Sequence, residues 1–117
     1  MKQLTGPGWA VMAVAALLYS GAAFAAEDKP EFTKAFLNDQ ANFAKGKKIW
    51  LEQCTHCHGA KSYPGKAPKL KPRRYKPGFV YRRITKGFRK MPAWNEVYDK
   101  DERMAVVAYV MSKEFSP

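Results

Sequence analysis

The sequence predicts an all-α domain of about three to four helices. Apolar residues recur at spacings of three and four within three segments, at about 40–53, 77–86 and 100–112, as they do on one face of a helix. No stretch shows convincing strand alternation or an internal repeat. The segments between these helices are rich in proline and glycine, which favour loops.

Residues 1–25 have the features of a signal peptide. A positively charged start precedes the apolar run Trp9–Leu18, and Ala23-Phe24-Ala25 has the A-x-A pattern of a cleavage site. Cleavage after about Ala25 would release the protein into a bacterial periplasm. Retention of the segment as a membrane anchor is the alternative, which the short apolar run disfavours. A flexible lead over 26–39 and a folded domain over 40–117 are then expected.

The first helix of the domain is predicted at about Gln40–Gln53, with Asn38 or Asp39 as its N-terminal cap. Its apolar stripe comprises Phe43, Gly46, Ile49 and Trp50. Glycine inside a helix costs about 1 kcal/mol relative to alanine. We therefore expect Gly46 to lie where another helix crosses closely.

Two further helices follow along the chain. One is predicted at Pro77–Lys86, because proline suits the first helical turn and Gly87 suits the stop. The other is predicted at about Lys100–Ser112, where Asp99 and Glu102 have the spacing of a capping box. Its apolar stripe comprises Met104, Val107, Ala108 and Met111.

Five consecutive residues carry the chemistry: Cys54-Thr55-His56-Cys57-His58. This C-x-x-C-H pattern is the attachment signature of a c-type haem. The two thiols can form thioether bonds to the haem vinyl groups, and the imidazole of His58 is a good ligand for iron. We therefore predict one covalent haem c held by Cys54 and Cys57, with His58 as an axial iron ligand.

Other interpretations of the motif are weaker. A redox-active C-x-x-C pair is expected near a βαβ pattern, which this sequence lacks. A structural zinc site needs four ligands, usually in two separated pairs, whereas both cysteines and both histidines lie within 54–58. A disulfide between neighbours so close would constrain little of the unfolded chain. His56 is interpreted as an exposed residue that does not bind iron.

The second axial position of the iron decides the chemistry of a haem protein. A methionine thioether there favours the ferrous state and raises the potential. Beyond the signal peptide the methionines are Met91, Met104 and Met111. Met104 and Met111 are seven residues apart on a predicted helix and are expected in the core. Met91 lies in a loop beside Pro92, and its position alone allows either an iron ligand or a packed hydrophobic residue.

The sequence resembles class I cytochrome c, the small electron carriers with a single haem. Four features carry the resemblance: Gly46-x-x-x-Trp50, the haem motif with Gly59, Ala67-Pro68-Lys69-Leu70, and Met91-Pro92 ahead of a last helix containing Tyr109. The resemblance implies a small cytochrome c fold wrapped around the haem, with His58 and Met91 as the two axial iron ligands. Ala67 stands where the family usually has glycine.

Further haem contacts are expected around this core set. Pro68 and Leu70 are expected on the proximal side of the haem, and Trp94 is expected to pack on it. The candidates for bonding the haem propionates are Arg73, Arg74, Tyr75 and Trp94.

The formal net charge is +11, and its distribution is uneven. Between Lys61 and Lys90 there are twelve lysines and arginines and no acidic residue. Such a segment would steer the approach of an acidic redox protein, such as a dehydrogenase, a reductase or an oxidase. Export argues against nucleic acid, while contact with an anionic membrane surface is an alternative.

These observations predict a periplasmic, monomeric carrier of single electrons whose haem iron cycles between Fe(II) and Fe(III). It is not expected to be an enzyme, and no catalytic residue is assigned. The alternative is a haem protein that binds or senses a small ligand by displacing Met91.

Overall fold

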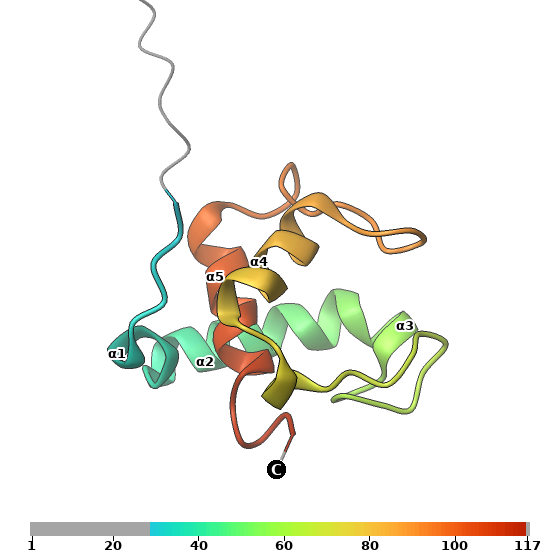
Figure 1. The fold of residues 1–117 in the computed structure, drawn as a ribbon, viewed down its shortest axis with the longest axis horizontal. Coiled ribbons are helices and arrows are strands. Elements are labelled where there is room, and N and C mark those ends of the chain that lie inside the picture. The colour runs from blue at the N-terminus through green and yellow to red at the C-terminus, as the bar shows by residue number, and fades with distance from the viewer. Residues whose placement is uncertain (1–28, 117) are drawn as a thin grey trace, which may run out of the picture.

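The computed structural model describes residues 29–116, which form a small all-α unit (Figure 1). The predicted signal peptide and the first residues of the predicted lead lie outside this range. In chain order the elements are α1 (Lys34–Leu37), α2 (Gln40–Ile49), the π-helix η1 (Trp50–Cys54), α3 (Thr55–His58), the 3-10 helix η2 (Pro72–Arg74), α4 (Pro77–Lys86) and α5 (Lys100–Val110). None of the described helices is long and apolar enough to cross a membrane.

The crossing of α2 and α5 is the centre of the fold (Figure 1). Gly46 of α2 lies directly against the backbone of α5, and a Cβ atom there would overlap the carbonyl oxygen of Ala105. The absence of a side chain therefore lets the two helix backbones approach. This confirms the expectation that Gly46 marks a close helix crossing.

The hydrophobic core surrounds this crossing and includes one face of α4. Its buried members are Ile49, Trp50, Val80, Tyr81, Ile84, Met104, Val106, Val107, Tyr109, Val110 and Phe115. Eight consecutive residues of α5, 103–110, are buried, so this helix is enclosed on all sides. The buried Arg103 joins α5 to α4 by donating from Nη1 to Thr85 Oγ1 at 2.7 Å.

The helix caps follow the predicted pattern. Of the two candidates, Asp39 caps α2 by accepting the backbone N–H of Asn42 at 2.9 Å. Asp99 and Glu102 form the complete capping box of α5. Gly87 ends α4 with a φ of 69°, a left-handed conformation that favours glycine.

The first helix extends further than predicted. Instead of ending near Gln53, the helical backbone continues through η1 and α3 to His58. The wider turns of η1 insert one extra residue per hydrogen-bonded turn where the helix enters the cysteine motif, whose first residue is Cys54. Gly59, with a φ of 79°, ends the run. The last helix is shorter than predicted and ends at Val110.

The prediction of a flexible lead over 26–39 is wrong for its second half. Thr33 caps α1 by accepting the N–H of Phe36 at 3.1 Å. The Phe32 ring packs edge-on against Phe36 and against Tyr81 of α4, with centroids 6.2 and 5.9 Å apart. Burial of these aromatic rings holds the segment on the domain.

Candidate functional site

The cysteine motif lies on helical backbone and comprises the last residue of η1 and the whole of α3. Cys54 is half-buried and Cys57 is exposed, and both thiols are free. Residues three apart on a helix lie on the same face, so the thiols are presented to the same side. Burial, and to a lesser extent the nearby Cys57, raises the pKa of Cys54 to about 12. The unmodified Cys54 thiol is therefore neutral at physiological pH.

His58 is held beside the indole of Trp50. The two ring centroids are 5.5 Å apart, and Trp50 Nε1 donates to the carbonyl oxygen of Gly59 at 3.1 Å. Burial lowers the pKa of His58, which favours the neutral imidazole that binds metals. Within the described residues, its Nδ1 is buried without a hydrogen-bond partner. A buried polar atom without a partner lowers the stability of a fold by about 1–3 kcal/mol, and here that atom belongs to the predicted iron ligand.

The loop after the motif folds back onto it. Ala67 donates its N–H to the carbonyl oxygen of Cys57 at 2.7 Å. A Cβ atom on Gly65 would overlap that same oxygen, so the chain passes close to the motif. Of the two residues predicted beside the haem here, Leu70 packs against the core and Pro68 is exposed. Because His58 Nδ1 has no partner, the Pro68 carbonyl makes no hydrogen bond to it.

Met91 closes a tight turn after α4. It exchanges two backbone hydrogen bonds with Phe88, each 3.0 Å long, and Arg89 within the turn has a φ of 55°. The Met91 side chain is half-buried and packs against the hydrophobic core. A Cβ atom on Gly87 would lie 2.5 Å from the Met91 carbonyl oxygen, so glycine is required at this position.

The predicted haem contacts lie around a shared core but do not form one cluster. Cys54, Leu70, Met91 and Trp94 all border the hydrophobic core. Trp94 also fixes its loop, because its backbone N–H donates to the carbonyl oxygen of Ile84 at 3.0 Å. The residues predicted to bond the haem propionates do not line one hollow. Arg73 lines a hollow of about 570 Å³, whereas Arg74 and Tyr75 line another of about 280 Å³.

Phe115 is a contributor to the site that the sequence did not reveal. Its ring packs edge-on against Trp50 at a centroid distance of 4.7 Å and against Tyr109 at 5.3 Å. Tyr109 in turn directs its hydroxyl to the carbonyl oxygen of Ala60, 3.4 Å away. Phe115 lies beyond α5, where no periodic pattern could assign it to the core.

We expect Trp50→Phe to destabilise the protein by about 1–3 kcal/mol, because it removes the donor to Gly59 and leaves a gap beside His58. Guanidinium unfolding of the haem-loaded protein measures the change. Tyr63→Phe is the control, because Tyr63 is 57% exposed and its hydroxyl makes no hydrogen bond within the described range. Equal losses of unfolding free energy in the two variants would show that the hydrogen bond from Trp50 to Gly59 does not stabilise the protein.

Residues 41–110 match the sequence model of a family described as cytochrome C oxidase, cbb3-type, subunit III. The chain belongs to this family of cytochrome c domains. It is therefore a c-type cytochrome domain, a kind of domain that typically carries electrons. No match is found among curated protein sequences.

Solved cytochromes share the fold. The c-type cytochrome NirC is 24% identical, with a TM-score of 0.54 over 68% of this chain and 99% of its own. Cytochrome cL of the marine methylotrophic bacterium Methylophaga aminisulfidivorans is 21% identical, with a TM-score of 0.57 over 71% of this chain and 67% of its own. The dihydro-heme d1 dehydrogenase NirN is 29% identical with a TM-score of 0.54 over 58% of this cytochrome, which spans only 16% of NirN. These matches bear out the predicted fold class.

Proposed function

We propose that this cytochrome is a periplasmic carrier of single electrons. It would bind one haem c through Cys54 and Cys57, with His58 and Met91 as the axial iron ligands. The observation that carries the proposal is the half-buried, neutral His58, whose buried Nδ1 is unpartnered within the described residues and which follows two free thiols on one helical face. This donor set fits a covalent haem, because thioethers and imidazole are the groups that c-type haems use.

When bound, the haem supplies an iron that gains and loses one electron between Fe(II) and Fe(III). The residues of the chain would hold it in a fixed environment. Trp50 restrains the backbone after His58, and the two hydrogen bonds between Phe88 and Met91 restrain the proposed distal ligand. Because both proposed ligands come from restrained backbone, little would need to move when the charge on the iron changes, which suits fast electron transfer.

The attachment is tested by the mass and the visible spectrum of the purified protein. Expression in cells with c-type haem attachment machinery should give a coloured protein whose haem survives denaturation, and replacing both Cys54 and Cys57 with alanine should abolish it. A colourless protein with two free thiols would refute the proposal. Cleavage after about Ala25 is checked in the same mass spectrum.

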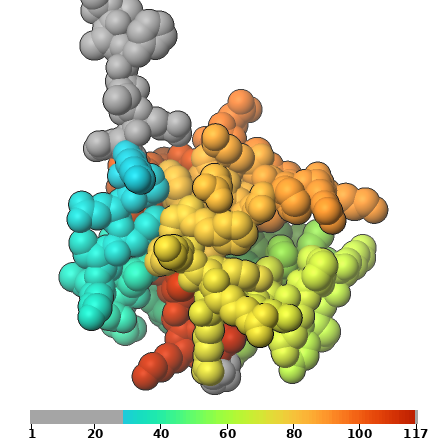
Figure 2. All heavy atoms as spheres, viewed as in Figure 1, coloured from blue at the N-terminus to red at the C-terminus, as the bar shows by residue number. Residues whose placement is uncertain are grey.

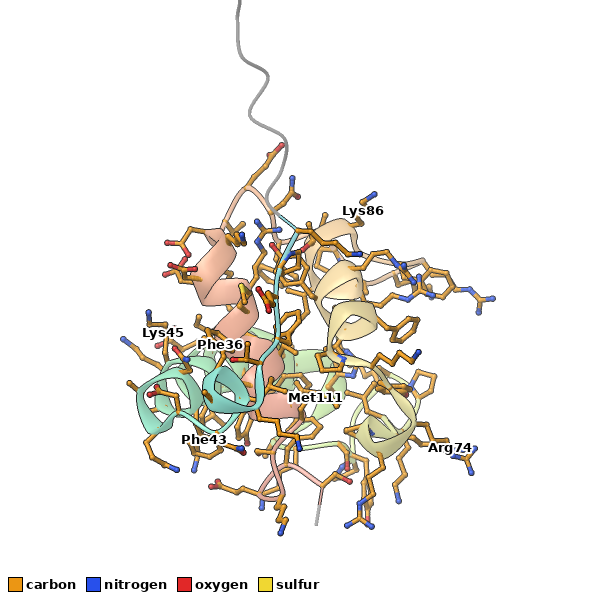
Figure 3. All side chains as sticks on the ribbon, turned by 60° about the vertical axis from the view of Figure 1, so that its left-hand side comes forward. Phe36, Phe43, Lys45, Arg74, Lys86 and Met111 are labelled. Atoms are coloured by element: carbon orange, nitrogen blue, oxygen red, sulfur yellow. The ribbon has the colours of Figure 1, made fainter. Side chains whose placement is uncertain are left out.

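The basic segment supports docking to an acidic redox protein. Within residues 29–116, the ion pairs are Lys47–Glu114 and Lys48–Glu52, so none of the twelve cations between Lys61 and Lys90 has an acidic partner. Lys86 and Arg74 both point away from the helices in Figure 3. Unneutralised charge of one sign steers an oppositely charged partner.

Electron transfer should therefore depend on salt. Oxidation of the reduced protein by anionic hexacyanoferrate(III) should slow by roughly tenfold between about 0.01 and 0.15 M salt, since added ions screen the attraction. Oxidation by cationic tris(phenanthroline)cobalt(III) should instead accelerate, which makes it the control. Stopped-flow absorbance measures both rates. If neither rate depends on salt, the basic segment does not influence the route of the electron.

A further inference from the structure

Arginine and phenylalanine side chains alternate along α4 and the turn that follows it. In order of contact the series is Arg82, Phe79, Arg83, Phe88 and Arg89, which we name the arginine–phenylalanine ladder. The Arg83 guanidinium carbon lies 3.9 Å from the Phe88 ring centroid and 4.9 Å from that of Phe79. Arg89 lies 5.1 Å from the Phe88 centroid. These distances are within the range of cation–π attraction.

The ladder leaves its hydrogen-bond donors available. Stacking uses the flat face of a guanidinium, whereas its N–H groups point outward in the plane. Within the described part of the chain, Arg82, Arg83 and Arg89 have neither an ion pair nor a side-chain hydrogen bond. Phe88 remains 49% exposed between two of them. The ladder thus presents ordered cations around an exposed ring.

The ladder is also held rigidly and lies next to the proposed distal ligand. Phe88 and Met91 exchange two backbone hydrogen bonds, and Arg89 lies within the turn that they close. Figures 1 and 2 show this orange segment after α4 projecting away from the helices. Binding to a fixed turn costs less conformational entropy than ordering free side chains.

We propose that the arginine–phenylalanine ladder is the docking site for a cluster of carboxylates on an acidic redox protein. This inference rests on the proposed electron-carrier function, and it assigns the docking of the partner to one part of the basic segment. Guanidinium groups bind carboxylates with two parallel hydrogen bonds, and arginine and aromatic residues dominate binding energy at protein interfaces. A partner seated here contacts the turn that carries Met91.

A membrane surface fits the ladder less well. Helices that lie on a membrane present a broad apolar face to the lipid. In α4 the apolar residues Val80, Tyr81 and Ile84 are buried against α5 and its neighbours. The exposed side of the ladder offers a single ring flanked by charges, which matches a small acidic protein patch.

The chain contains a matched control for this proposal. Lys69 lies over the Tyr63 ring at 4.2 Å, and Tyr63 is 57% exposed, on the loop that follows the haem motif. This pair also combines one cation with one exposed ring inside the basic segment. Phe88→Ala can therefore be compared with Tyr63→Ala, and Arg83→Gln with Lys69→Gln, at equal cost in net charge.

The test is an NMR titration of the reduced, haem-loaded, ¹⁵N-labelled protein with a blocked synthetic peptide of aspartate and glutamate. We expect shift changes centred on residues 79–91 and binding at least about threefold weaker in Phe88→Ala and Arg83→Gln, while the control pair changes little. No binding, or equal losses in both pairs, would overturn the ladder as the docking site. Ladder-dependent binding to phosphatidylglycerol vesicles but not to the peptide would also overturn it, in favour of a membrane.

The same samples separate the two proposals. Their visible spectra and reduction potentials report the haem and its ligands, which Arg83→Gln should leave in place. A normal spectrum together with no binding of the peptide would refute only the proposed docking role of the ladder. A purified protein without haem would refute the proposed electron-carrier function, whether or not it binds the peptide.

Discussion

Replacing Met91 with alanine should lower the reduction potential by on the order of 100 mV or more, within the roughly 0.8 V range over which axial ligands set haem potentials. A thioether stabilises ferrous iron, and its removal leaves a harder or an empty position in its place. The ferric spectrum should also lose its sulfur-to-iron charge-transfer band near the red edge. Spectroelectrochemistry of the purified protein measures both changes.

Met104→Leu is the control for this experiment. Met104 is buried in the core, and a swap that conserves volume costs less than about 1.5 kcal/mol. Its potential and spectrum should stay close to those of the parent protein. Unchanged values in Met91→Ala would remove Met91 from the iron, whereas rapid carbon monoxide binding by the unmodified reduced protein would favour the alternative function in ligand sensing.

Gly46→Ala should destabilise the protein by about 3 kcal/mol or more, at the upper end of the range for overpacked cores. The added methyl group would overlap the carbonyl oxygen of Ala105, which is backbone and cannot turn aside as a side chain can. Relief requires α2 and α5 to separate, and their separation would disturb the core around Trp50. Chemical unfolding of the haem-loaded protein, followed by circular dichroism, measures the loss.

Gly78→Ala provides the matched comparison. Gly78 lies in the first turn of α4, and a Cβ atom there would meet no atom within 4 Å. Because alanine is the better helix former by about 1 kcal/mol, this variant should be neutral or slightly more stable. Similar unfolding midpoints for the two variants would mean that the α2–α5 crossing is looser than the structure indicates.

The sequence predicted the features that depend on local spacing. The helix starts followed from capping residues such as Asp39 and Asp99, and the end of α4 followed from Gly87. The close crossing followed from the energetic cost of Gly46, which only a tertiary contact could offset. The haem attachment motif is equally local, since its two thiols and His58 fall within five residues.

Features that depend on distant contacts could not be predicted in this way. Phe32 and Phe115 flank helices without belonging to any periodic stripe, yet both pack on core aromatic rings. The helix continues past Gln53 because η1 adjusts its turns, which helix propensities do not encode. The arginine–phenylalanine ladder joins α4 to the following turn and became visible only once the chain had folded.

The position of Phe115 has a practical consequence for handling the protein. Phe115 presses on Trp50, and Trp50 holds the backbone that follows His58. An affinity tag that replaced Phe115 would therefore disturb the backbone after His58 through these two side chains. A tag should therefore be placed where it leaves Phe115 and its contact with Trp50 intact.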